Sequence, residues 1–437
     1  MKKFILLMAF TFFSTMAYSQ VGHVMQGVGA FNMSMGGAAT GQPLDISGAL
    51  QWNPAAISSF DQQILNVDVG LFFSSPELNS TVPEFDQNGQ PTGNYFSGTT
   101  ADDRGISPMP AVAYVWASEK SKHSFGLSVF GISGFGVTFP ENMANPINMP
   151  QNMGGFGHIE SDYMLLQTGI TYAYQLSDKF SIGVEPNFSL SSLELAPNPT
   201  ASPSQTAGYP STNKATATGY GAQVGLFFDS GSGFKSGIAY KTNVHFSDFE
   251  FENTYLDGST STNSFNMDYP SIFSVGLGYS ADVLDLALDY RFVNYENTDG
   301  FSESGWTNTA SVAGFGWKNI SVISTGIQYK GIDNLPLRLG YTYSSNPIDE
   351  ELTFFNIPAT AVIANAFQVG AGYNIGNKIN FDIVYHRGMS AGKTSGPVLN
   401  PQLAQQYPNG AIPGSEISYD MNTDLIMVGF KYLFSSK

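Results

Sequence analysis

The sequence predicts an all-β protein, a 14-stranded antiparallel transmembrane β-barrel plugged by a small N-terminal hatch, and three observations predict it. Only 12% of the residues are charged, although the chain is rich in Gly and aromatic residues. Soluble domains carry about 25% charged residues. From about residue 63, segments alternate apolar and polar residues. The connections between these segments alternate between short and long, as in barrels of the outer membrane.

The composition excludes several classes of protein. The chain of 437 residues has no Cys, which rules out disulfides, Cys-ligated metals and a Cys nucleophile. Its net charge of −17 argues against a nucleic-acid partner. The 34 Phe and 22 Tyr residues argue against a disordered chain.

The first residues have the pattern of a signal peptide. A basic start, Met1-Lys2-Lys3, precedes the apolar run Phe4–Phe13 and the small-residue cleavage site Ala17-Tyr18-Ser19. The apolar run is too short to cross a bilayer as a helix. We therefore expect a signal peptide over residues 1–19 and export of the rest of the chain.

The next segment, residues 20–62, differs from the rest of the chain. It is rich in small residues, lacks strand alternation and ends in Trp52-Asn53-Pro54-Ala55. Fourteen strands enclose a lumen too wide to be filled by wall side chains alone. We therefore expect residues 20–62 to form the hatch and residues 63–437 to form the barrel.

The strand segments each have one apolar face. In Leu284–Phe292, Leu and aromatic residues occupy one face, whereas Asp285, Asp289 and Arg291 lie on the other. A membrane barrel turns such an apolar face toward lipid and its polar face toward the lumen. The fourteen predicted strands lie near residues 63–74, 108–118, 121–132, 163–176, 178–195, 215–229, 234–250, 266–280, 283–297, 319–331, 335–345, 364–375, 378–389 and 422–435.

The connections support the same topology. Short turns are predicted at Glu119-Lys120, Leu176-Ser177, Ser230–Gly233, Ala281-Asp282, Ile332–Asn334 and Gly376-Asn377. Long loops are predicted at 75–107, 133–162, 196–214, 298–318, 346–363 and 390–421, with a medium loop at 251–265. Short periplasmic turns and long outer loops are typical of outer-membrane barrels. A closed barrel pairs all its backbone groups and leaves no edge, so we expect a monomer in contact with outer-membrane lipid.

Four groups of residues resemble the FadL/TodX family, whose members are outer-membrane channels for long-chain fatty acids and other hydrophobic compounds. They are Gly29–Ala39 followed by Asn53–Ile57, Phe125–Ser128 running on to Ser133–Val137, Gly316–Asn319, and Leu335–Tyr341 followed by Asn346-Pro347. The resemblance covers nearly the whole mature chain, with the motifs in matching order. Within the family, the chain resembles a Bacteroidetes-like member.

The resemblance implies a route for passive uptake of a hydrophobic molecule. The solute enters among the outer loops, reaches a pocket in the barrel and leaves sideways where the third strand kinks inward. Asn53 and Pro54 correspond to the hatch residues that meet the kink, and Ser133 and Gly136 correspond to the kink itself. From the residues alone, a simple turn at Asn53-Pro54 is the favoured interpretation.

The resemblance also implies a contact for a ligand carboxylate. Lys318 matches the family lysine with this role, although it could also be a solvated loop residue. The second basic contact of the family is missing, because the corresponding segment contains Glu194 and no basic residue. A neutral or aromatic ligand therefore stays open. Arg291 and Arg338 lie on polar strand faces and could replace the missing cation, or pair with lumen acids such as Asp289 or Asp382.

Other functions have weaker support. The five His residues are scattered without catalytic or metal-ligand spacing, so we expect no enzyme activity, cofactor or metal, and His386 is interpreted as a pore-lining polar group. The acidic outer loops are interpreted as solvated, with calcium binding left open. A non-specific porin and a structural or partner-binding barrel of a secretion system, like the shuttle barrels of Bacteroidetes, are the alternatives.

Overall fold

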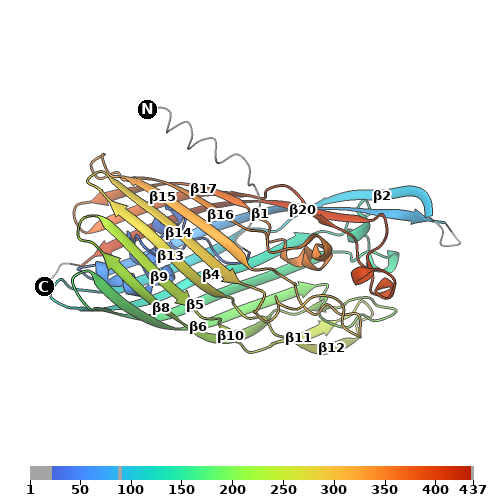
Figure 1. The fold of residues 1–437 in the computed structure, drawn as a ribbon. Coiled ribbons are helices and arrows are strands. Elements are labelled where there is room, and N and C mark those ends of the chain that lie inside the picture. The colour runs from blue at the N-terminus through green and yellow to red at the C-terminus, as the bar shows by residue number, and fades with distance from the viewer. Residues whose placement is uncertain (1–21, 87–90, 435–437) are drawn as a thin grey trace.

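The computed structural model describes residues 22–86 and 91–434, so the predicted signal peptide lies outside the described residues. Fourteen antiparallel strands close into a barrel (Figure 1). They are β1 (Ile64–Phe85), β3 (Ser107–Trp116), β4 (His123–Phe139), β5 (Ile159–Gln175), β6 (Phe180–Ala196), β8 (Ala215–Asp229), β9 (Phe234–Lys241), β13 (Ser271–Ser280), β14 (Leu284–Asn294), β15 (Ile320–Tyr329), β16 (Leu337–Ser344), β17 (Asn365–Ile375), β18 (Ile379–Met389) and β20 (Glu416–Leu433). Pairing of β1 with β20, from Ile64–Leu433 to Thr81–Glu416, closes the barrel.

The strand faces are divided as the alternation predicts. In β14, Leu286, Leu288 and Tyr290 are exposed, whereas Asp289 and Arg291 are buried in the lumen. Exposed and half-buried rings pair near the short turns, with centroid distances of 4.9 Å for Phe180–Phe228, 5.5 Å for Phe381–Phe430 and 6.3 Å for Trp116–Phe125. Such rings are typical of an aromatic girdle at a membrane interface. Among the described residues, no helix has the length and apolar character needed to cross a membrane.

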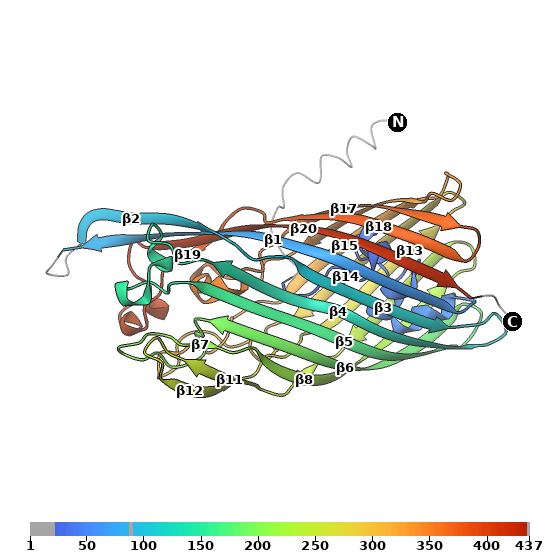
Figure 2. The ribbon, with the colours of Figure 1, turned by 180° about the vertical axis from the view of Figure 1, so that it is seen from behind.

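The strands extend further into the outer loops than predicted. β1 continues to Phe85 and pairs with β2 (Pro91–Ala101), so the loop prediction for 75–107 is wrong over most of its length. The two strands project beyond the barrel (Figure 2). Their Ser-, Thr- and Asn-rich sequence has no continuous apolar face. The period-2 signal is therefore lost although the backbone stays extended.

One separate short sheet and two short strands that extend the barrel sheet occupy the outer loops. The predicted strand 234–250 breaks after Lys241, resumes as β10 (His245–Phe246) and continues as β11 (Phe249–Thr254). β11 pairs with β12 (Thr260–Phe265) and β7 (Ser211–Thr212), so much of the predicted loop 251–265 is also strand. β19 (Thr394–Gly396) adds to the outer part of β20.

The N-terminal segment fills the barrel at the end with the short turns (Figures 1 and 2). It contains α2 (Ala30–Ser34), α3 (Ile46–Trp52) and a 3-10 helix (Pro54–Ser59). The Asp45 side chain caps α3 by accepting from the backbone N–H groups of Ser47 and Gly48. We call residues 22–60 the hatch.

Glycines of the wall let the hatch lie directly against the strands. A Cβ on Gly225 of β8 would lie 2.0 Å from Asn53 Oδ1, and one on Gly237 of β9 would lie 1.9 Å from the carbonyl oxygen of Thr40. Both distances are far below van der Waals contact. Glycine is therefore required at these positions because of close approach by the hatch.

Candidate functional site: a cavity at an unpaired stretch of the wall

The barrel wall contains a stretch where two neighbouring strands do not pair. β3 and β4 pair only from Trp116–Phe125 to Ala111–Phe130. Beyond Ala111, β3 continues to pair with β1, and beyond Phe130, β4 continues to pair with β5. We call the unpaired stretch, Ser107–Pro110 of β3 opposite Gly131–Val137 of β4, the window.

The local sequence explains the window on both strands. Pro108 and Pro110 have no N–H group, and residues two apart direct their backbone groups to the same side of a strand. Pairing with β1 continues through both prolines, so their missing donors lie on the side of β4. On β4, the register with β5 shifts between Gly131 and Ser133, which makes Ile132 a β-bulge. A bulge bends its strand and ends regular pairing.

The first residues of the hatch occupy the window from inside. Val24 forms a β-bridge with Ser133, and the backbone N–H of Met25 donates to the carbonyl oxygen of Ile132 at 2.9 Å. Gly134 N–H and the Ser133 hydroxyl donate to the carbonyl oxygen of His23 at 3.2 and 2.9 Å. The hatch thus satisfies backbone groups that β3 leaves unpaired.

The His23 ring is enclosed by a cluster of aromatic rings. Its Nδ1 lies 2.9 Å from the hydroxyl oxygen of Tyr295, and its ring stacks on Phe301 at a centroid distance of 4.8 Å. The other rings within 6.4 Å are Phe135, Tyr163, Tyr269, Tyr295 and Trp317. This cluster fixes the start of the hatch beside the window. No motif in the sequence indicated a role for His23.

Above the window, the connection between β2 and β3 closes the wall again. The Asp102 side chain accepts from Thr138 N–H, and Asp103 N–H donates to the carbonyl oxygen of Thr138 at 2.8 Å. Arg104 pairs with Asp162 at 2.6 Å and donates to the carbonyl oxygen of Ser161 at 2.7 Å. The window is therefore bounded on both sides, and sequence reasoning missed Arg104 because its partners are distant in sequence.

The charges around this closure are mutually dependent. Lys214 also pairs with Asp162, and the hydrogen bond that its ammonium donates to this carboxylate raises the pKa of Lys214. Partial burial raises the pKa of the Asp102 carboxyl. Arg104 and Lys214 share Asp162, and the carboxylates of Asp102 and Glu194 add further negative charge beside these two cations. This leaves little unbalanced positive charge on Arg104 for a ligand.

A cavity of about 430 Å³ lies behind the window. Its lining is mostly apolar and comes from the hatch, from both edges of the window and from β5, β6, β18 and β20; it includes Phe72, Met109, Phe135, Leu165, Leu190, Ile363 and Leu425. On β5, buried Tyr163 and Leu165 line it together with Met164 and Leu166, which are exposed on the outer face. Residues from both faces of the wall therefore contribute to one cavity.

The predicted kink residues lie at this site, but the predicted hatch residues do not. Ser133 and Gly136 line the cavity. Asn53 instead donates to the carbonyl oxygens of Leu226 and Thr40 at 3.0 and 2.9 Å, and Pro54 lies near Gly225 of β8. The expected contact of Asn53 and Pro54 with the third strand is therefore wrong. The start of the hatch, His23 to Met25, makes that contact.

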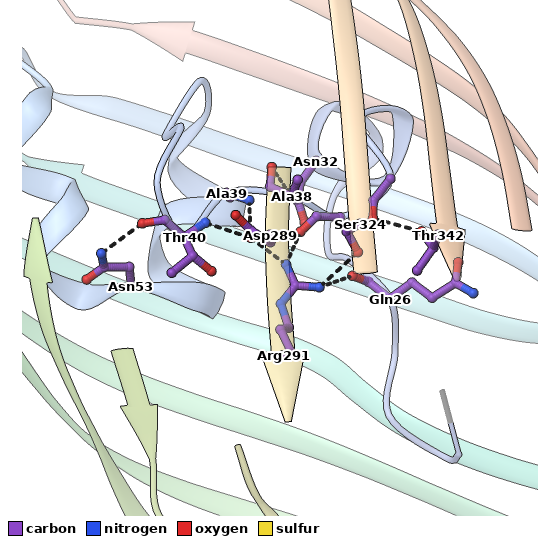
Figure 3. A network of polar contacts seen from close by, with 12 residues as sticks. Gln26, Asn32, Ala38, Ala39, Thr40, Asn53, Asp289, Arg291, Ser324 and Thr342 are labelled. Carbon is purple, nitrogen blue, oxygen red and sulfur yellow. Dashed lines mark hydrogen bonds and ion pairs between the residues drawn. The ribbon is translucent and has the colours of Figure 1, made fainter. Parts of the chain in front are cut away.

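Arg291 and Arg338 hold the hatch and do not line the cavity. Arg291 pairs with Asp289 at 2.8 Å (Figure 3). The guanidinium of Arg291 also lies 3.7 Å from the ring centroid of Trp52. Asp289 in turn accepts from the backbone N–H groups of Ala39 and Thr40, both at 2.9 Å.

We call this arrangement of a wall arginine, its acid partner and a hatch ring a clasp, and a second clasp lies on β16 and β18. Arg338 pairs with Asp382 at 2.7 Å and lies 3.7 Å from the ring centroid of Phe31. Of the two roles left open for Arg291 and Arg338, the structure has the ion pairs with Asp289 and Asp382. Each clasp joins a wall cation to a hatch ring, which adds a cation–π contact to a buried ion pair.

Lys318 lies in the outer loops. Its side chain is 54% exposed and pairs with Asp349, and it is absent from the cavity lining. This exposed position fits the alternative interpretation of Lys318 as a solvated loop residue. A second small apolar pocket of about 50 Å³ in the same loops is lined by Phe156, Tyr209, Trp306, Phe354 and Phe355, among others. In the described ranges, no group of three or more His, Asp or Glu residues could hold a metal ion.

The fold and the site define the class of protein: a plugged β-barrel of the outer membrane. The chain belongs to the outer membrane protein transport protein family (OMPP1/FadL/TodX), whose family model matches residues 15–432. This family and the structural neighbours are transport channels rather than enzymes.

Solved structures support the fold. A FadL homologue from Pseudomonas aeruginosa is similar with a TM-score of 0.72 and 16% identity over 95% of this chain and 100% of that chain. The toluene transporters TodX of P. putida and TbuX of Ralstonia pickettii have TM-scores of 0.68 and 0.63, with 16% and 15% identity. These cover 94% of this chain in both cases, and 100% and 99% of their own chains. No curated protein sequence matches the chain significantly.

Proposed function

We propose that the protein passively admits hydrophobic small molecules, and that the ligand leaves sideways into the membrane through the window. The observation that carries the proposal is the cavity lining, which combines lumen-facing and lipid-facing residues at a stretch without β-pairing. A route through the wall keeps an apolar solute out of water. Removal of apolar surface from water is the main driving force for the movement of such a solute.

The hatch residues control this route. His23, Val24 and Met25 cover the window and are held by Ser133 and Ile132. Withdrawal of these few residues exposes the cavity to lipid, whereas the two arginine clasps keep the rest of the hatch in place. Asn53 and Pro54 anchor the hatch to β8, at a distance from the window. Gly136 leaves room for Arg104, which closes the outer side.

The charge of the lining favours a neutral ligand over a fatty acid. Arg104 is the one Lys or Arg among the described residues that line the cavity, and it is already paired with Asp162. A carboxylate transferred from water to an apolar site needs a free counter-charge. Aromatic or aliphatic hydrocarbons and their neutral derivatives carry no such cost.

Uptake into proteoliposomes tests the proposal. We expect a neutral alkylbenzene to enter faster than a long-chain fatty acid of similar size, and Lys318→Ala to leave both rates unchanged because the lysine lies outside the cavity. If the fatty acid entered faster and Lys318→Ala removed this advantage, the result would instead support a contact between Lys318 and the ligand carboxylate. If neither compound enters above empty liposomes, a partner-binding barrel becomes the better interpretation.

A further inference from the structure

His386 places a ring with a hydrogen-bond donor in the mostly apolar lining of the cavity, near the hydroxyl group of Thr423. It lies on β18 with 4% of its surface exposed, and it lines the cavity near Ile363 and Leu425. The structure gives its two ring nitrogens different surroundings. One faces a neighbouring strand, and the other has no hydrogen-bond partner among the described residues.

The partner of the first nitrogen determines where the ring proton lies. Gln368 stands directly opposite His386 in the pairing of β17 with β18, and its Nε2 lies 3.1 Å from His386 Nδ1. The same Nε2 donates to Gln26 Oε1 at 3.2 Å. An amide nitrogen has two hydrogens, so it can donate one to each neighbour. Nδ1 is then the acceptor, and a neutral imidazole carries its proton on Nε2.

The ring is neutral for the same reason. A charged imidazolium would need to donate from both nitrogens, and an N–H on Nδ1 would face the amide N–H of Gln368. His386 therefore offers one neutral N–H donor from Nε2. When a ligand covers this N–H group without offering an acceptor, the lost hydrogen bond costs free energy, and a ligand oxygen avoids that cost.

We propose that His386 is a specificity-determining residue that donates a hydrogen bond to a neutral oxygen acceptor on the ligand. This inference rests on the proposed channel function and narrows its substrate class to hydrophobic molecules with a single carbonyl-type oxygen. Gln368 is a positioning residue, and Gln26 connects this donor to the part of the hatch that covers the window. A ligand that binds His386 thus lies beside the hatch residues that must move.

Two compounds of almost equal shape test the proposal. Butyrophenone and butylbenzene differ only by a carbonyl group in place of a methylene group, and both are small enough for the cavity. Their affinities are measured by equilibrium partition into proteoliposomes, with empty liposomes subtracted. We expect His386→Phe to lower the ratio of ketone to hydrocarbon affinity roughly three- to tenfold, the size of one net hydrogen bond, with butylbenzene binding unchanged.

Two variants make this result specific. Gln368→Met frees Nδ1 to take the proton, so the ketone preference should fall by a smaller factor; this variant carries the test if His386→Phe does not fold. Thr360→Val removes another polar group from the lining and should leave the ratio unchanged. An unchanged ratio in His386→Phe, with both compounds still binding, overturns the donor assignment alone. Failure of both compounds to bind the native protein overturns the proposed function and this inference with it.

Discussion

At the scale of single residues, position relative to the hatch decides the role of each charge. Arg291 and Arg338 could be placed on lumen-facing positions from the alternation alone, and their acid partners could be named. Their role could not be predicted, because it depends on where Trp52 and Phe31 lie after folding. Their sequence positions give no signal for these contacts.

Arg291→Met should loosen the hatch. Removing one partner of a buried ion pair leaves Asp289 uncompensated, which costs about 3–5 kcal/mol in other proteins. We expect faster proteolysis of the hatch and larger conductance in planar bilayers. The double variant Asp289→Asn with Arg291→Met should recover part of the loss, and Arg387→Met, which removes a partly exposed pair, is the control. An Arg291→Met protein with native protease resistance would contradict the clasp.

Gly136→Ala should weaken the outer closure of the window. A Cβ at this position would lie 1.9 Å from Arg104 Nη1 and 2.6 Å from the carbonyl oxygen of Ser161 to which Nη1 donates, so the guanidinium must shift away from β4. We expect faster uptake of a neutral aromatic compound in proteoliposomes. Gly131→Ala is the matched control, because its nearest neighbour, Pro110, would be at an ordinary 3.7 Å. Equal uptake by the two variants would show that Arg104 does not close the window.

At the scale of elements, the strands could be predicted but a missing pairing could not. Alternation located all fourteen barrel strands, because each has one face in lipid. It contains no information on whether neighbouring strands pair along their full length. The pattern Ser107-Pro108-Met109-Pro110 was the available signal, since two prolines on one side of a strand remove its donors there.

Replacement of both prolines tests this origin of the window. The double variant Pro108→Ala with Pro110→Ala restores two N–H groups that face β4. Pairing between β3 and β4 can then extend into the window. We expect slower uptake, with ligand affinity unchanged because the cavity interior is intact. Pro83→Ala, in the projecting hairpin, should have no effect on either quantity. Unchanged uptake in the double variant would mean that the bulge on β4 alone maintains the window.

At the scale of the whole molecule, barrel, hatch and cavity are interdependent. The wall glycines accept the hatch, the arginine clasps hold it, and its first residues replace the pairing that β3 and β4 lack. The sequence predicted the barrel and the hatch because lipid and a wide lumen impose strong patterns on composition. It could not locate the cavity, since the lining comes from segments as distant as Gln26 and Leu425.

The most direct measurement of the central claim is transport through a window that can be locked. The chain has no Cys, so a single disulfide can be introduced between Pro110→Cys and Gly131→Cys, because a Cβ on Gly131 would lie 3.7 Å from Pro110 Cδ across the window. Val112→Cys with Val129→Cys joins two residues that already pair below it and is the control. We predict that oxidation stops uptake of a neutral alkylbenzene only in the window variant and that a reductant restores it. Native uptake through the locked window would contradict lateral exit at this site.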